Sequence, residues 1–60
     1  METTGNYLLK GDVFIYDGET WKCTENNGFI VSADNLNKSS IRNCIMWIGG
    51  AEKNKITILR

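Results

Sequence analysis

The chain has 60 residues with seven basic and seven acidic side chains, two cysteines, no histidine and no proline. A chain of this length buries only about 60% of the surface that it exposes when unfolded, so we expect one small domain with a marginal core. The zero net charge argues against a general nucleic-acid binder, because such domains carry a basic stripe. No apolar run approaches the roughly 18 residues of a membrane-spanning helix, so we expect no membrane partner.

The N-terminal segment, residues 1–6, is polar, and it predicts a flexible end ahead of a single domain over residues 7–60. It lacks the basic and apolar regions of a signal peptide, which favours the cytoplasm. In that reducing compartment we expect Cys23 and Cys44 to be free thiols. Because free cysteine is among the most buried residue types, both are expected to lie inside the domain.

Residues 8–33 are rich in β-branched and aromatic side chains and predict a three-stranded antiparallel meander. Asp17-Gly18 lies between two apolar runs, which is the sequence signal for a two-residue hairpin loop of type I′. Asn27-Gly28 gives the same signal for the second turn.

Residues 41–48 fit a helix or a strand. Apolar side chains recur there at helical spacing, but three isoleucines and the short length favour a strand. Residues 55–60 alternate in polarity and predict a closing strand. We therefore predict an all-β fold, an antiparallel meander of about five strands that closes into an SH3-like barrel. The alternative is an α+β fold in which a helix over residues 37–48 packs on the sheet.

The two turns also predict the register of the meander. The first places Phe14 opposite Trp21, and the second places Thr24 opposite Val31. Because side chains alternate along a strand, the register sorts the meander into two faces. The aliphatic face, which has the composition of a core, holds Val13, Ile15, Thr20, Lys22, Thr24, Phe29, Val31 and Ala33. The aromatic face holds Phe14, Tyr16, Trp21, Cys23 and Ile30, with Asp12, Glu19, Glu25 and Asp34 at its rim.

The aromatic face has two interpretations. It fills one end of a strongly bent sheet, or it forms a surface for binding or self-association. On the second interpretation the partner-binding residues are Phe14, Tyr16, Trp21 and Glu19. A twofold homodimer is then the default assembly, because it is the commonest closed symmetry.

Catalytic chemistry has no recognisable residue set in this sequence. Without histidine there is no Ser-His or Cys-His arrangement. Gly49-Gly50 lacks the following Lys-Ser or Lys-Thr of a phosphate-binding loop. Two cysteines without histidine do not make a zinc site. We therefore predict a protein that is not an enzyme and uses no metal and no cofactor.

The segment YLLKGDVFIYDGETWKC, residues 7–23, resembles small chitin-binding-type modules. In those modules a Gly-Asp pair leads into a hairpin with a central glycine and an aromatic residue after the turn. The spacing before Gly-Asp differs here by one residue, and their proline-containing segment has no counterpart. The resemblance implies carbohydrate binding through an aromatic face as an alternative function.

Very small, neutral chains rich in Asn, Lys and Ile are typical of accessory proteins from phage and mobile elements. We therefore predict a non-catalytic binding module, of the accessory or inhibitor type, that acts by protein–protein interaction with another protein of unknown identity. The alternatives are carbohydrate binding and weak single-stranded nucleic-acid binding. Nucleic acid is disfavoured because carboxylates rather than basic residues surround the aromatic side chains.

Overall fold

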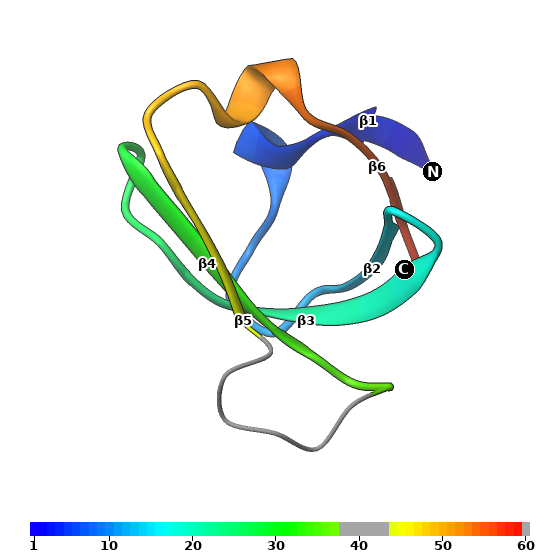
Figure 1. Ribbon diagram of the computed structural model, residues 1–60. Helices are drawn as coiled ribbons and strands as arrows, with labels where there is room; N and C mark the ends of the chain where they lie inside the picture. Colours follow the sequence, from blue (N-terminus) through cyan, green and yellow to red (C-terminus); the bar gives the residue numbers. More distant parts are fainter. Residues whose placement is uncertain (38–43, 60) are drawn as a thin grey trace.

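The computed structural model describes residues 1–37 and 44–59 (Figure 1). Six antiparallel strands form one sheet in the order β1-β6-β2-β3-β4-β5. The strands are β1 (Glu2–Thr4), β2 (Val13–Tyr16), β3 (Glu19–Asn26), β4 (Ile30–Asn35), β5 (Cys44–Ile48) and β6 (Lys55–Ile58). Two single-turn 3-10 helices are η1 (Gly5–Tyr7) and η2 (Ala51–Lys53).

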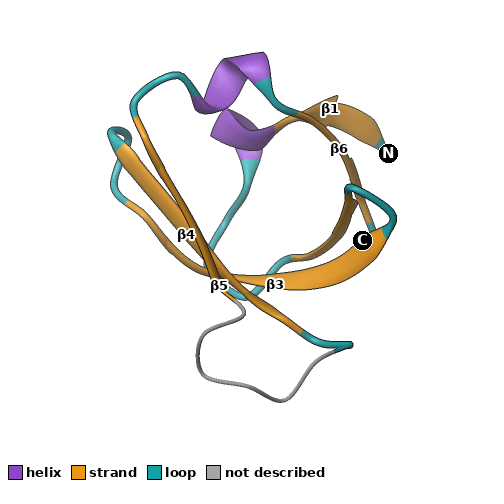
Figure 2. Cartoon of the chain, in the orientation of Figure 1, coloured by secondary structure: helices purple, strands orange, loops and turns teal. Residues whose placement is uncertain are grey.

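The sheet curls around its core, and η1 and η2 contact one another where its two ends approach (Figure 2). Among the described residues, β1 pairs only with β6 and β5 pairs only with β4, so the sheet is not closed into a barrel. The all-β prediction is confirmed. The helical alternative is wrong for residues 44–48, which form β5, while the rest of that segment from residue 38 onward lies outside the described residues.

The N-terminal segment differs from the flexible end that its polarity predicted. Glu2 lies opposite Thr57, so β1 extends the sheet beyond β6. The Met1 ammonium donates to the Ile58 carbonyl at 2.7 Å, and the Gly5 N–H donates to the Asn54 carbonyl at 3.0 Å. These bonds occupy the outer edge of β6, which would otherwise carry unpaired backbone groups.

The first hairpin has the predicted turn and register. Asp17 and Gly18 have φ values of 54° and 75°, and positive φ at both central positions is the mark of a type I′ turn. Phe14 lies opposite Trp21, as predicted. The right-handed twist of this turn suits the strands that it joins.

The second hairpin turns one residue later than predicted. The central positions are Gly28 and Phe29, and only Gly28, with a φ of 92°, is left-handed. Glycine at the first central position is the pattern of a type II′ turn. The Asn27 side chain selects this turn, because its Oδ1 accepts the N–H of Phe29 at 2.9 Å and that of Ile30 at 2.7 Å.

A β-bulge at Thr24 changes the predicted faces of the sheet. Cys23 lies opposite Ala33, whereas Glu25 lies opposite Ser32. The strand β3 therefore advances two residues while β4 advances one, and the alternation reverses at Thr24. Cys23 and Ala33 consequently face inward together, and Glu25 faces solvent.

Phe14, Trp21 and Cys23 of the predicted aromatic face lie in the core, and the prediction that the aliphatic face forms the core is wrong. Ile30, which the prediction placed on the aromatic face, lies on the outer face opposite the exposed Ile48. Of the residues predicted for the aliphatic face, only Val31 and Ala33 are buried, because the bulge brings them inside. Ile15 is exposed and Lys22 lies in solvent. The buried apolar residues are Leu8, Phe14, Trp21, Cys23, Val31, Ala33, Ala51, Ile56 and Ile58.

Trp47 of β5 is partly buried and packs against the core. Its ring lies edge-on to Tyr16, with centroids 5.1 Å apart and an interplanar angle of 76°, and it is tilted against Phe14 at 6.4 Å. Gly5 provides the space for this ring, because a Cβ at that position would collide with it and would lie 3.1 Å from the Ala51 carbonyl oxygen. The indole thus packs β5 against Gly5 of η1, and η1 in turn contacts η2.

The contact between Gly5 and Trp47 predicts the effect of one added methyl group. Gly5→Ala should lower the free energy of unfolding by about 3 kcal/mol, the upper end of the range for overpacking. The matched change Gly18→Ala, at a site with open space, should cost about 1 kcal/mol through its backbone conformation alone. Urea titrations followed by tryptophan fluorescence measure both. Equal losses for the two variants would show that Gly5 is not held against the ring.

Candidate functional site

Two of the predicted partner-binding residues lie in the core. Phe14 is 0% exposed and Trp21 is 7% exposed. The Trp21 indole N–H donates to the Tyr16 carbonyl at 2.9 Å, which satisfies its only polar group. Tyr16 is half-buried against Trp47. The structure therefore gathers these residues, but it gathers them around the core rather than on a surface.

Glu19, the fourth predicted site residue, belongs to a hydrogen-bond network at one end of the sheet. Its carboxylate accepts a bond from the side-chain amide of Asn35, which is buried. The Asn35 Oδ1 accepts the Asn37 N–H at 2.7 Å, and the Asn37 Oδ1 accepts the Thr20 N–H at 2.8 Å. Glu19 thus joins the end of β4 to the start of β3 and has a structural role in this arrangement.

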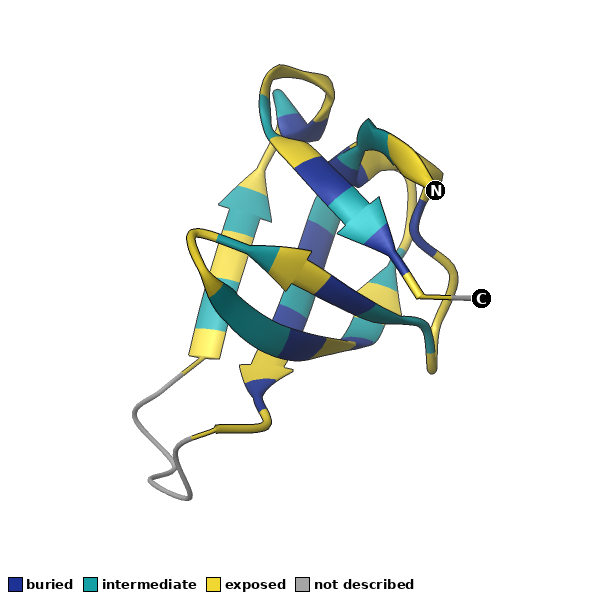
Figure 3. Ribbon diagram, turned by 90° about the vertical axis from the view of Figure 1, so that its right-hand side faces the viewer, coloured by how far each residue is buried: buried dark blue, intermediate teal, exposed yellow. Residues whose placement is uncertain are grey.

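The strongest surface feature is the edge strand β5. It contains no charged residue. Ile45 and Trp47 point inward and pack on the core, whereas Cys44, Met46 and Ile48 are exposed. Met46 is 60% exposed and Ile48 is 63% exposed. Figure 3 shows this alternation along the strand that follows the grey segment.

Apolar side chains from the neighbouring hairpin extend this row. Ile30 lies directly opposite Ile48, so the two share a face of the sheet. Phe29 is 61% exposed and lies beside Gly49, whose N–H donates to the Phe29 carbonyl at 2.7 Å. We call Phe29, Ile30, Cys44, Met46 and Ile48 the β5 surface.

The register shows which backbone groups of β5 face the open edge. The bond from the Gly49 N–H to the Phe29 carbonyl makes this pair a hydrogen-bonded one. Hydrogen-bonded and non-hydrogen-bonded pairs alternate in an antiparallel ladder. Trp47 and Ile45 therefore direct their N–H and C=O groups to β4, while Ile48, Met46 and Cys44 direct theirs to the open edge. The same residues thus present exposed side chains and backbone groups that have no partner among residues 1–37 and 44–59.

The two edges of the sheet differ in how they are protected. β1 has only three residues, and it carries the charge of Glu2. Short length and charge are the usual protections of an edge strand against pairing with another chain. β5 has five residues and no charge, and its pairing with β4 has an unbroken register. Within the part of the chain that the structure describes, β5 is therefore the edge that is open to another strand.

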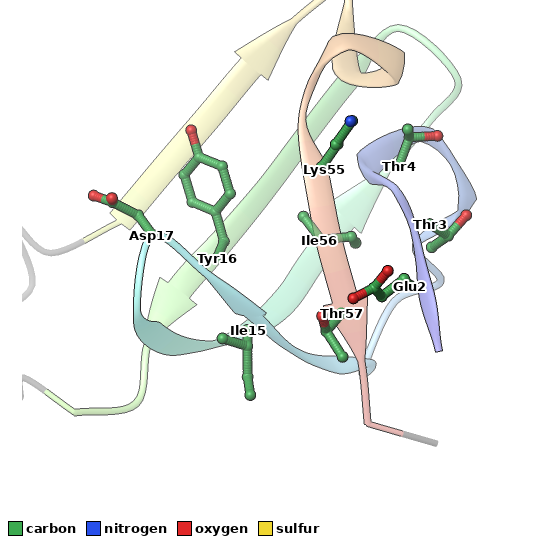
Figure 4. Close-up of a pocket in the computed structure, with 9 residues that line it drawn as sticks. All are labelled: Glu2, Thr3, Thr4, Ile15, Tyr16, Asp17, Lys55, Ile56 and Thr57. Carbon is green, nitrogen blue, oxygen red and sulfur yellow. The ribbon is translucent and has the colours of Figure 1, made fainter.

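A groove of about 440 Å³ with a mixed polar and apolar lining lies across β1, β6 and β2 (Figure 4). Glu2, Thr57 and Ile15 form one cross-strand row on its surface. Hydroxyl, carboxylate and ammonium groups make it suitable for polar contacts. The sequence prediction missed this groove because it left β1 out of the sheet. Its lining residues are Glu2, Thr3, Thr4, Ile15, Tyr16, Asp17, Lys55, Ile56 and Thr57.

The two cysteines lie in different environments, and both are free. Cys23 is buried, as predicted, and burial raises the pKa of its thiol above the ordinary value, an effect that a hydrogen bond with the Glu25 backbone partly offsets. The protonated thiol donates to the Glu25 carbonyl at 3.5 Å. Cys44 is exposed, so the prediction that it is buried is wrong. Cys44 precedes the inward-facing Ile45 on β5, so the Cys44 side chain points to solvent. The described part of the chain contains no group of three metal-binding side chains and no helix that is long and apolar enough to cross a membrane.

The raised pKa of Cys23 predicts a loss of stability in alkali. The folded state holds its proton more tightly than the unfolded state, so unfolding becomes easier as the pH rises above the ordinary thiol value of about 8.5. Cys23→Ala should reduce the slope of unfolding free energy against pH above about pH 8.5. Cys44→Ser, at the exposed thiol, should leave the slope unchanged. An identical slope in all three proteins would contradict the burial of Cys23.

The positions of Trp21 and Met46 predict opposite outcomes for truncation. Trp21→Ala removes a core side chain and should cost about 3–5 kcal/mol of stability, enough to unfold a domain of this size. Met46→Ala changes an exposed side chain and should alter stability by less than about 0.5 kcal/mol. Circular dichroism and thermal melts distinguish them. A folded Trp21→Ala protein with an unchanged melting temperature would place Trp21 outside the core.

Comparisons with known proteins give no relative to draw on. No family model matches the chain, and no curated protein and no solved structure matches it either. The function is therefore inferred from the geometry and chemistry of the described residues.

Proposed function

We propose that the chain is a non-catalytic binding module that captures another protein chain at the β5 surface by strand addition. The observation that supports this is the coincidence of exposed apolar side chains and outward-facing backbone groups on Cys44, Met46 and Ile48. In strand addition the backbone bonds supply affinity, and alternate side chains supply specificity. The β5 surface offers both from the same residues.

The exposed side chains provide the energy for such binding. Phe29, Met46 and Ile48 are each about three-fifths exposed. Complete burial of a side chain of this size is worth about 1.5–3 kcal/mol, so covering the exposed part of all three favours association by several kcal/mol. None of the three belongs to the buried core of the described residues.

The alternative functions have less support. The carbohydrate alternative depended on an aromatic face, and two of its members, Phe14 and Trp21, are buried. Single-stranded nucleic acid would need basic side chains beside aromatic ones, but β5 carries no charge and the net charge of the chain is zero. Catalysis would need a general base or an activated nucleophile. The groove across β1, β6 and β2 contains no histidine and no cysteine, and its carboxylates, Glu2 and Asp17, are exposed to solvent.

The proposal also includes an SH3-like fold, an accessory or inhibitor role and a location in the cytoplasm. The return of β6 beside β2 and the 3-10 turn η2 just before β6 support a relation to small SH3-like barrels. An accessory or inhibitor protein acts by occupying the surface of its partner, which is what strand addition achieves. Two free thiols, one of them exposed, suit the reducing conditions of the cytoplasm.

A lysine on the open edge tests the proposal. Met46→Lys places a charge in the β5 surface, and edge lysines oppose strand addition. The matched control is Leu59→Lys, at a 51% exposed leucine after β6, because β2, β3 and β4 separate this strand from β5. Tagged proteins are used to capture partners from the source cell, and thermal melts verify that each variant is folded.

The wild type and Leu59→Lys should retain the same captured proteins, and Met46→Lys should lose them. Capture that is equal for all three proteins would contradict the proposal. A saturable change in tryptophan fluorescence with chitin-type oligomers or single-stranded DNA, unaffected by Met46→Lys, would favour one of the alternative functions instead.

A further inference from the structure

We infer that the strand which pairs with β5 is β5 of a second copy of this chain, so that two sheets join edge to edge about a twofold axis. This inference depends on the proposed binding role of the β5 surface and specifies its partner. It replaces the expectation that Phe14, Tyr16 or Trp21 would form a homodimer interface, because the first and the last of these are buried.

The outward-facing groups of β5 define the register of the pair. Cys44, Met46 and Ile48 face the open edge, and they are spaced symmetrically about Met46. In an antiparallel pair centred on Met46, each Met46 lies opposite its own copy, and Cys44 of one chain lies opposite Ile48 of the other. All three pairs are then hydrogen-bonded pairs, and at two bonds each they make about six backbone bonds.

The side chains of β5 are compatible with their own copies. Residues directly opposite one another in an antiparallel pair point to the same face, so the exposed row of one chain continues into that of the other. β5 has no charged residue, and the chain has a formal net charge of zero. Two copies therefore experience no electrostatic repulsion between their β5 strands and none from their net charges. A foreign strand would have to provide a matching apolar row, whereas a second copy already has one.

The short strand implies a weak dimer. Five residues in a single ladder bury much less surface than the roughly 1,200 Å² at which stable interfaces begin. The dimer should therefore dissociate on dilution and increase with protein concentration, and the melting temperature should rise with concentration in the same range. The other edge, β1, should not pair, because it is short and carries Glu2.

Sedimentation equilibrium over about 0.01–1 mM protein tests the assembly. The wild type and Leu59→Lys should change from monomer to dimer across this range. Met46→Lys should stay folded and have a dissociation constant at least about tenfold higher, because each twofold pair would bring two lysines together. A wild type that remains monomeric at the highest concentration would overturn the inference, as would a dimer that Met46→Lys leaves intact.

Single-cysteine variants test the register. In a Cys44→Ser background, Met46→Cys places one thiol opposite its own copy, at the Cα separation of about 5.5 Å that a disulfide accepts. Mild oxidation should cross-link most of this protein. Ile48→Cys in the same background lies opposite a serine and should cross-link only at the background level. Equal cross-linking of the two variants would overturn the Met46-centred register. Cys23 is 1% exposed and does not interfere.

These results separate the inference from the proposed function. A monomeric wild type whose captured partner is nevertheless lost in Met46→Lys would overturn the second-copy inference and leave strand addition to a different protein in place. A concentration-dependent dimer with the Met46-centred cross-link supports the inference even if no other protein is captured. A monomeric wild type with capture unaffected by Met46→Lys would contradict both.

Discussion

One extra residue in β3 determines which side chains fill the core. The bulge at Thr24 lets β3 advance by two residues against one in β4. Before it, Trp21 and Cys23 point inward beside Ala33, and after it Glu25 points to solvent. Without the bulge, strict alternation would direct the Glu25 carboxylate into the apolar interior, where an unpaired charge is very costly. The composition of the core therefore depends on this irregularity.

The sequence predicted the features that depend on local chemistry. Asp17-Gly18 specifies its own turn, and the turn specifies the register of the first hairpin. β-Branched content correctly indicated a strand over the described part of residues 41–48. The bulge was missed because no glycine or other local signal accompanies Thr24. β1 was missed because its partner β6 lies more than fifty residues further along the chain, and a long-range pairing leaves no local pattern.

The predicted site residues Phe14 and Trp21 lie in the core for a related reason. Large aromatic side chains indicate either a core or a binding surface, and only the assembled sheet distinguishes the two. The structure encloses Phe14 and Trp21 and leaves Met46 and Ile48 in water. It also leaves the backbone of β5 open on one side, while a short, charged strand terminates the other edge. The proposal of binding through β5 therefore depends on how the sheet ends, which composition alone does not reveal.

Amide hydrogen exchange in β5, followed residue by residue by NMR, tests the openness of this edge most directly. In dilute protein, the amides of Ile45 and Trp47 should be protected because they bond to β4, and those of Met46 and Ile48 should exchange rapidly. At high protein concentration the amides of Met46 and Ile48 should become protected from exchange. Four equally protected amides in the dilute monomer would show that the edge is already covered within one chain, and the account would then be wrong.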